Sequence, residues 1–247
     1  MTSNAPSHQQ PAEITRASIE DLDSLYEDPD LVVINKPSGL LVHRGWDNDK
    51  VVAMTLVRDY VGRHVFPVHR LDRPTSGALI FALNKEAARA LSQSFEAGHH
   101  QKAYLALVRG ITPDEGIIDH PVPKEPRGER VDAITYFRRL YYFERYSWVA
   151  AWPKTGRLHQ IRRHLKHMTH PLIGDVNYGK GEHNRLFRER FGLQRLALHA
   201  SSISFCHLRS GEPVTVRAPM PADLAGPLQA MGVPEVLFTA DPQDVSN

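Results

Sequence analysis

Short runs of β-branched and aromatic residues recur along the chain, and most of them end at residues typical of turns. Leu31 to Asn35 reads LVVIN and continues into KPSG, which predicts a strand followed by a turn. Ser76 to Leu83 (SGALIFAL) and Lys102 to Gly110 (KAYLALVRG) predict two more strands. ITYFRRLYYF and SWVAAWP predict a strand pair, and LALHASSISF and VTVRAP predict the closing strands.

Two segments instead space their apolar residues as helices do. Asn84 is a candidate N-cap, and Gly98 can end the helix whose apolar stripe consists of Ala87, Leu91 and Phe95. Residues 159–168 (HQIRRHLKHM) predict a second helix, with Ile161, Leu165 and Met168 on one face. Its polar side is then expected to hold Arg162, Arg163 and Lys166.

Strands outnumber helices in this pattern and mostly follow one another directly, which is typical of an α+β fold. Residues 1–20 are polar and predict a flexible tail, residues 21–235 a single folded domain, and residues 236–247 a loose end. Residues 112–130 contain four prolines and many charges, so we expect a long connection there. YGKGEHNRLFRERFG is expected to be a polar insertion.

Composition excludes several classes of protein. No run approaches the roughly 20 apolar residues of a membrane span, and the N-terminus lacks the pattern of a secretion signal. Cys206 is the only cysteine, which rules out an internal disulfide or a cysteine-rich zinc site and favours the cytoplasm. The chain has no GxxxxGK[ST], GxGxxG, GxSxG or HExxH motif, so nucleotide hydrolysis, dinucleotide binding, serine hydrolysis and zinc proteolysis have no support.

Charge changes this picture only locally, because the net charge of the 247 residues is +2. Between Trp152 and Ile173 there are five Lys or Arg residues and no Asp or Glu. Such a patch suits a phosphate backbone, but taken alone it is more often a solvated cationic face. The three-residue spacing of His164, His167 and His170 permits a metal site, although histidines facing phosphate or solvent are the simpler explanation.

The stretch HRLDRPTSGALIF (residues 69–81) resembles the signature of the RluA-type pseudouridine synthases. Four other blocks are similar to that family and occur in its order, within about residues 25–218: NKPSGLLVH, QKAYLALVRG, KTGRLHQIRRHLKHMTHPLIGD and LALHA. The resemblance implies the α+β pseudouridine synthase fold, a mixed and largely antiparallel central sheet flanked by helices and loops, with the active-site cleft across the sheet. The domain of residues 21–235 would then be the catalytic domain.

The same resemblance implies three catalytic residues, Asp72, Tyr104 and Arg162. A carboxylate withdrawn from water needs a cation nearby, and Arg162 is the partner implied for Asp72. Tyr104 would stack on the uracil, although taken alone it could equally be a core aromatic of a strand. Leu198 is expected to pack against the uracil, with plain core packing as the alternative.

A stacked uridine cannot be reached by an enzyme, so the target base must be flipped out. The resemblance implies that Arg70 fills the vacated place, with a surface salt bridge as the alternative. Arg73, Lys36, Arg163 and Lys166 are candidate phosphate contacts, which would position the RNA without reading its sequence.

The resemblance implies an isomerase that converts uridine to pseudouridine in RNA, and it is strongest for the branch that acts on uridine 65 of tRNA. A sibling acting on ribosomal RNA and a non-catalytic RNA-binding protein remain alternatives, with a hydrolase using Asp72 and a histidine more distant. Because the reaction is an internal rearrangement, we expect no metal, nucleotide or redox cofactor. The expected partner is tRNA, with no membrane and no protein partner, and the chain is expected to be a cytoplasmic monomer.

Overall fold

The computed structural model describes residues 22–44, 51–125 and 128–241. Its strands are β1 (Ser24–Glu27), β2 (Leu31–Lys36), β3 (Phe66–Pro67), β4 (Ser76–Ala82), β5 (His100–Arg109), β6 (Glu115–Asp119), β7 (Val122–Pro123), β8 (Arg130–Val131), β9 (Ile134–Phe143), β10 (Tyr146–Pro153), β11 (Leu198–Cys206) and β12 (Pro213–Arg217). Its helices are α1 (Ala53–Val61), α2 (Lys85–Glu96), α3 (Gln160–His167), α4 (Gly181–Phe191) and α5 (Ala222–Ala230), with a 3-10 turn at Glu235–Leu237.

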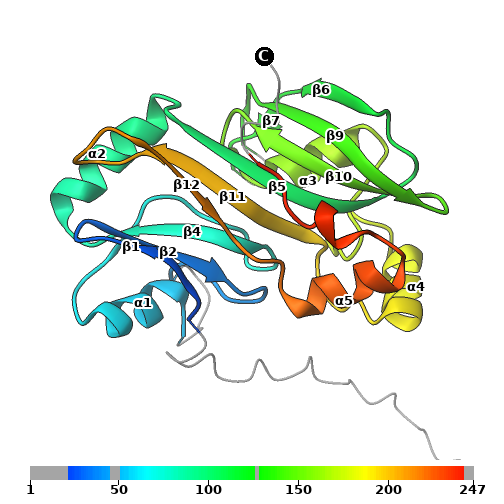
Figure 1. Cartoon of the computed structure of the whole chain (residues 1–247). Coiled ribbons are helices and arrows are strands. Elements are labelled where there is room, and N and C mark those ends of the chain that lie inside the picture. Colours follow the sequence, from blue (N-terminus) through cyan, green and yellow to red (C-terminus); the bar gives the residue numbers. More distant parts are fainter. Residues whose placement is uncertain (1–21, 45–50, 126–127, 242–247) are drawn as a thin grey trace, which may run out of the picture.

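One ten-stranded sheet organises the chain (Figure 1). Its main path runs β1-β2-β4-β11-β5-β10-β9-β6, while β3 pairs with β4 and β12 with β11. The pairing of β4 with β11 is parallel and the other pairings are antiparallel. This confirms the predicted α+β fold with a mixed, largely antiparallel sheet. Across the described ranges, none of the helices has the length and apolar character needed to cross a membrane.

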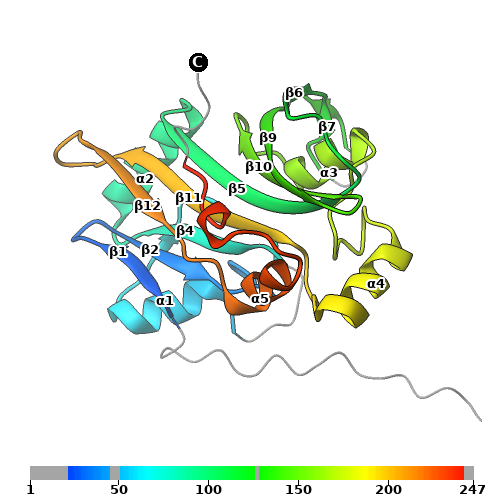
Figure 2. The same cartoon turned by 45° about the vertical axis from the view of Figure 1, so that its right-hand side comes forward.

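Alternation along β5 divides the core between the two faces of the sheet, because successive strand residues point to opposite sides. Tyr104, Ala106 and Val108 belong to the cluster that contains residues of α1 and α3. Leu105 and Leu107 belong to the cluster that contains residues of α4 and α5, which lie next to each other in Figures 1 and 2. The face of β5 that carries Tyr104 is therefore the one covered by α3.

Gly77 allows β4 and β11 to approach each other where they run parallel. It pairs with Ala200, its φ is +117°, and a Cβ placed there would lie 2.2 Å from the Ala200 carbonyl oxygen. Only glycine tolerates both this φ and this contact. The close crossing positions the start of β11, including Leu198, against the loop that precedes β4.

Replacing Gly77 by Ala is therefore expected to lower the free energy of unfolding by roughly 3–5 kcal/mol, because the backbone strain and the clash add. Gly62→Ala is the matched control. Its φ of +68° is also left-handed, but nothing lies within 4 Å of the added Cβ, so a loss of only about 1 kcal/mol is expected. Urea unfolding of the two variants measures the difference, and equal losses would contradict the close contact.

Several segments carry more structure than their sequence indicated. The connection expected over residues 112–130 contains β6, β7 and the first residue of β8. The polar insertion contains α4, whose Phe187 is fully buried. Helices α1 and α5 were not predicted at all. Arg162 does not lie on an exposed side of its helix, since only 3% of its surface is accessible.

The C-terminal boundary also differs from the expected one at residue 236. Phe238 and Ala240 are buried, and the indole N–H groups of Trp148 and Trp152 donate to the carbonyls of Leu237 and Asp241. The packed domain therefore extends to residue 241, because these backbone acceptors satisfy buried tryptophans. The tail expected at residues 1–20 and the end at residues 242–247 lie outside the described residues.

Candidate active site

Asp72 lies in the segment between β3 and β4, and hydrogen bonds hold that segment in place. The Thr75 N–H donates to the Asp72 carbonyl at 3.0 Å. The Gly39 N–H donates to the Arg73 carbonyl at 2.8 Å, and the Ser38 hydroxyl donates to the Pro74 carbonyl at 2.8 Å. The turn after β2 therefore braces the loop that carries the carboxylate.

Lys36 also contacts this loop. The sequence analysis predicted Lys36 as a phosphate contact, but its side chain is fully buried and cannot reach a phosphate. Its ammonium donates to the carbonyls of Pro37 and Leu40 at 2.8 Å and of Arg73 at 3.2 Å. Burial lowers the pKa of this ammonium to about 7, while the three carbonyls accept its three N–H groups. Lys36 is the last residue of β2, and its side chain points into the protein, which is why it does not reach solvent. Lys36 holds the Asp72 loop instead of touching RNA.

Arg162 joins Asp72 to a second carboxylate, Asp175. Its Nη1 donates to Asp72 Oδ2 at 2.9 Å, and its Nε and Nη2 donate to the two Asp175 oxygens at 2.8 and 2.9 Å. The Asp175 side chain is fully buried and the Asp72 side chain is 23% exposed. The bidentate ion pair with Asp175 fixes the plane of the Arg162 guanidinium. Its Nη1 is thereby oriented to donate a hydrogen bond to Asp72.

The electrostatics of this triad follow from its geometry. Burial opposes the charge on Arg162, but its hydrogen bonds to Asp175 and Asp72 outweigh burial and raise its pKa. Burial likewise raises the pKa of Asp175, yet the hydrogen bonds and charge of Arg162 prevail and leave that pKa below its usual value. Arg162 and Asp175 are therefore both charged near neutral pH, and their opposite charges balance within the buried pair.

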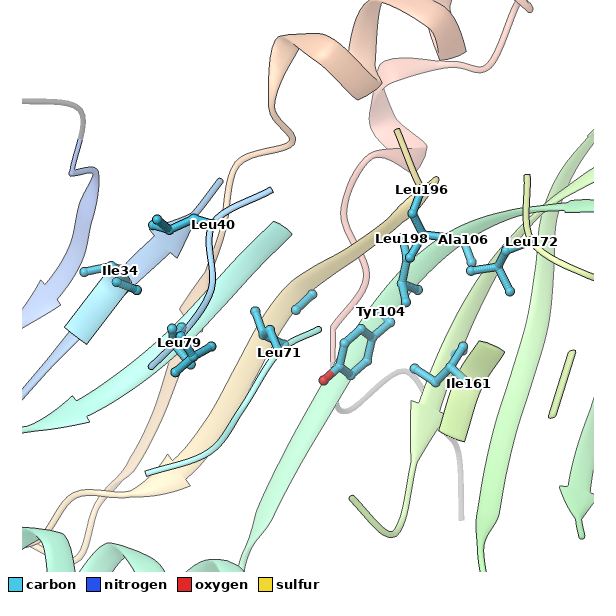
Figure 3. Packing of buried hydrophobic residues seen from close by; sticks show 14 of the residues in the cluster. Ile34, Leu40, Leu71, Leu79, Tyr104, Ala106, Ile161, Leu172, Leu196 and Leu198 are labelled. Atoms are coloured by element: carbon cyan, nitrogen blue, oxygen red, sulfur yellow. The ribbon is translucent and has the colours of Figure 1, made fainter. Parts of the chain in front are cut away.

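Asp72 opens into a cleft of about 470 Å³ that Tyr104, Ile161, Arg162 and Leu198 also line. Figure 3 shows the Tyr104 ring between Leu71 and Ile161, with Leu198 nearby. Burial, reinforced by the negative charge of Asp72, raises the pKa of Tyr104. The cleft thus offers an apolar slot with a neutral phenol and a carboxylate in one place, which suits a planar, polar ring.

A wider hollow of about 1,100 Å³ adjoins the cleft and shares Asp72, Arg70 and His159 with it. Its lining includes two carboxylates, Asp72 and Glu125, and six Lys or Arg residues, namely Arg70, Arg73, Lys124, Arg157, Arg162 and Arg195. Arg70 is exposed where the two spaces meet. This basic hollow can receive a polyanion beside the carboxylate of Asp72.

His159 is a residue of the site that the sequence analysis did not single out. It caps the start of α3 with a φ of +53°, a strained conformation for a histidine. Its Nε2 lies 3.7 Å from Asp72 Oδ1, and its Nδ1 is hydrogen-bonded to the Tyr178 hydroxyl at 2.9 Å. Burial, more than its charged neighbours, lowers the pKa of His159 and favours a neutral ring.

Arg163 and Lys166 surround Tyr178 and do not line the cleft or the adjoining hollow. Arg163 Nε donates to the Tyr178 hydroxyl at 3.0 Å. The Arg163 guanidinium lies 5.4 Å and the Lys166 ammonium 5.7 Å from the centre of the tyrosine ring. Both cations therefore lie beside the site rather than in it.

Comparisons with known proteins agree with this geometry. The sequence profile of the RNA pseudouridylate synthase family matches residues 30–167, a span that includes Asp72, Tyr104 and Arg162. The chain belongs to the RNA pseudouridylate synthase family. Proteins named tRNA pseudouridine synthase C from Haemophilus ducreyi and Salmonella typhimurium are 43% and 46% identical to this pseudouridylate synthase. Each alignment covers 80% of this chain, with 90% and 85% of the respective relatives.

Solved structures of human proteins share the fold of this synthase. Human RNA pseudouridylate synthase domain containing 1 is 28% identical, with a TM-score of 0.70 over 85% of this chain and 89% of its own. Human RNA pseudouridylate synthase domain containing 4 has a TM-score of 0.71 at 23% identity, covering 85% of this chain and 93% of its own. The recognised resemblance and the predicted fold class are thereby confirmed.

The histidines of α3 serve structural contacts in this pseudouridylate synthase. His164 is hydrogen-bonded through Nδ1 to Thr135 and through Nε2 to the His120 carbonyl, and the His120 and His167 rings stack with centres 3.6 Å apart. In residues 22–44, 51–125 and 128–241, no group of three or more His, Cys, Asp or Glu residues is placed to hold a metal ion.

Proposed function

We propose that this pseudouridylate synthase isomerises a uridine of tRNA to pseudouridine and that Asp72 is its catalytic carboxylate. The observation that carries the proposal is the ion pair between Asp72 and Arg162 at the edge of the cleft that holds Tyr104. The tRNA substrate is supported by the names of relatives that are 43–46% identical over most of their length.

The chemistry is balanced within the nucleoside itself. The bond between N1 and C1′ breaks, the uracil turns, and a bond forms between C5 and C1′. C5 then loses a proton and N1 gains one, so no co-reactant is consumed. Asp72 supplies a carboxylate oxygen next to the reacting sugar and base, and the hydrogen bond from Arg162 fixes the direction in which that carboxylate points.

The base must leave its stack to reach Asp72. Its ring then lies on Tyr104 and against Leu198 in the 470 Å³ cleft. Arg70, exposed at the junction of the two hollows, fills the place that the uracil vacates. The RNA strand follows the basic hollow, where Arg73 and Arg157 face its phosphates.

The proposed target is uridine 65, in the part of tRNA where the TΨC arm meets the acceptor stem. We propose a monomer acting without a protein partner, because Asp72, Tyr104 and Arg162 line one cleft within a single chain. The single cysteine supports a cytoplasmic location.

Tyr104→Phe separates stacking from proton transfer. We expect kcat to fall about 100-fold while the Kd for tRNA stays the same, because the ring remains but the group that relays the C5 proton is lost. Uridine deuterated at C5 should then react more slowly than normal uridine. Tyr104→Ala should additionally weaken binding by roughly 1–3 kcal/mol. A fully active Tyr104→Phe variant would restrict Tyr104 to stacking.

The proposed function is tested by mapping pseudouridine in tRNA and ribosomal RNA from cells with and without the gene. Carbodiimide labelling followed by primer extension marks each pseudouridine as a stop. Loss of a stop at tRNA position 65 supports the proposal. Loss of a stop in ribosomal RNA would mean that the substrate is ribosomal RNA. If no stop is lost, an RNA-binding protein without catalytic activity is favoured.

A further inference from the structure

Lys102 lies in the catalytic cleft but has no part in the chemistry described above. It precedes Tyr104 by two residues on β5, so both side chains point to the same face of the sheet. Both line the 470 Å³ cleft. Lys102 is partly buried, and its ammonium lies 5.2 Å from the centre of the Phe95 ring.

Among the described residues, no carboxylate pairs with this ammonium. Within residues 22–44, 51–125 and 128–241, no carboxylate forms an ion pair with Lys102 and no hydrogen bond reaches its Nζ. A withdrawn cation without a partner is unfavourable, and burial accordingly lowers the pKa of Lys102 to about 8. Such an arrangement is expected where a ligand supplies the missing charge.

Three stacked aromatic side chains beside Lys102, those of Phe95, His69 and His100, are neutral. Phe95 stacks between the rings of His69 and His100, with centres 5.8 and 4.1 Å away. Burial, followed by the charge of Lys102, lowers the pKa of His100 to about 4 and that of His69 well below its usual value. The Nδ1 atoms of both histidines are buried without a hydrogen-bond partner among the described residues. The described residues at this end of the cleft therefore supply a positive charge and polar nitrogens, but no carboxylate that pairs with Lys102.

We propose that Lys102 binds a backbone phosphate of the RNA next to the flipped uridine. This inference rests on the proposed function. A phosphate carries the full negative charge that an uncompensated ammonium in a poorly solvated site favours, whereas a uracil carbonyl carries only a partial charge. Because Lys102 and Tyr104 share one cleft, the phosphate that it meets is one that flanks the nucleotide stacked on Tyr104.

The first test compares Lys102→Met with Lys85→Met. Methionine keeps an apolar stem against Phe95, while Lys85 is an exposed residue at the start of α2 that lines neither hollow. We expect Lys102→Met to be at least as thermally stable as the wild type, because an unpaired charge is removed from a partly buried position. Its Kd for an unmodified tRNA transcript should rise roughly tenfold, and the slope of log Kd against log salt should fall by about 0.9. Lys85→Met should leave all three quantities unchanged.

The second test identifies the RNA group. Transcripts carrying an uncharged methylphosphonate at one of the two phosphates flanking the target uridine are bound to wild type and to Lys102→Met. At one of the two positions the methylphosphonate should weaken binding to the wild type about tenfold and leave binding to Lys102→Met unchanged, as expected of a direct pair.

Two results would overturn the inference. One is a Lys102→Met variant that loses stability but keeps its Kd and salt slope, which makes the residue structural. The other is a methylphosphonate that weakens binding equally in both proteins, which would mean that Lys102 contacts the base and not the phosphate. Failure of the proposed function would look different, since the wild type would then form no pseudouridine in the same transcript.

Discussion

Replacing Asp72 by Asn is expected to lower kcat for pseudouridine formation by about 1,000-fold or more, because the charged oxygen beside the reacting nucleoside is lost. The shape of the side chain is almost unchanged, and Arg162 keeps its two hydrogen bonds to Asp175. The fold and the Kd for tRNA should therefore stay close to those of the wild type. Release of tritium from tRNA labelled at uridine C5 measures kcat, and filter binding measures Kd.

Glu182→Gln is the control for this experiment. It removes the same charge from a side chain that is 82% exposed on α4 and lines neither hollow. Its kcat and Kd should equal those of the wild type. An Asp72→Asn variant that keeps a tenth or more of the activity would refute the assignment of Asp72, whereas a variant that no longer binds tRNA would give it a structural role.

Replacing Arg162 by Gln is expected to destabilise the folded protein by about 3–5 kcal/mol at neutral pH, because it leaves the fully buried Asp175 without its cation. The activity should fall as well, since Asp72 loses its partner in the ion pair and the hydrogen bond that orients it. Urea unfolding at pH 7 measures the first effect, and tritium release from the soluble variant measures the second.

The dependence of this loss on pH distinguishes an ion pair from simple packing. The folded-state pKa of Asp175 is lowered, so its stabilising contribution is present above the unfolded pKa of about 3.8 and disappears as pH falls through the lower folded value. In Arg162→Gln the unpaired Asp175 prefers the neutral form, so its penalty should shrink as pH falls from 7 towards 5. The gap between wild type and variant therefore narrows in acid.

The double variant Arg162→Gln/Asp175→Asn completes the experiment. Removing both charges should restore part of the stability lost in the single variant, because no unpaired carboxylate remains buried. Activity should stay low, since Asp72 still lacks its partner. A double variant less stable than Arg162→Gln at pH 7 would contradict an unpaired buried charge as the origin of the loss.

Local sequence patterns predicted the elements that carry the site, but not all of its contacts. The strands of Tyr104 and Leu198 and the helix of Arg162 follow from periodicity, and Asn84 caps its helix by accepting from the Ala87 N–H. Helical spacing placed Arg162 on a polar side, whereas a partner 13 residues later draws it inward. The spacing of apolar residues predicts local elements but not the tertiary partners of a side chain, so the sequence analysis did not identify Asp175.

Lys36 and His159 illustrate the same limit in two other ways. A lysine at the end of a strand normally reaches solvent, but three carbonyls of neighbouring turns enclose Lys36. His159 was read as part of a helical pattern, yet its left-handed backbone turns it towards Asp72. A histidine in the same sequence block as Arg162 was the one signal that could have indicated it.

The most direct test of the account is pseudouridine mapping on one unmodified tRNA transcript treated with purified wild-type protein or with Asp72→Asn, at equal RNA occupancy and without added metal or nucleotide. The account predicts a single carbodiimide-dependent stop at uridine 65 with the wild type and none with the variant. A stop of equal strength with both proteins would show that the isomerisation does not require the carboxylate paired with Arg162.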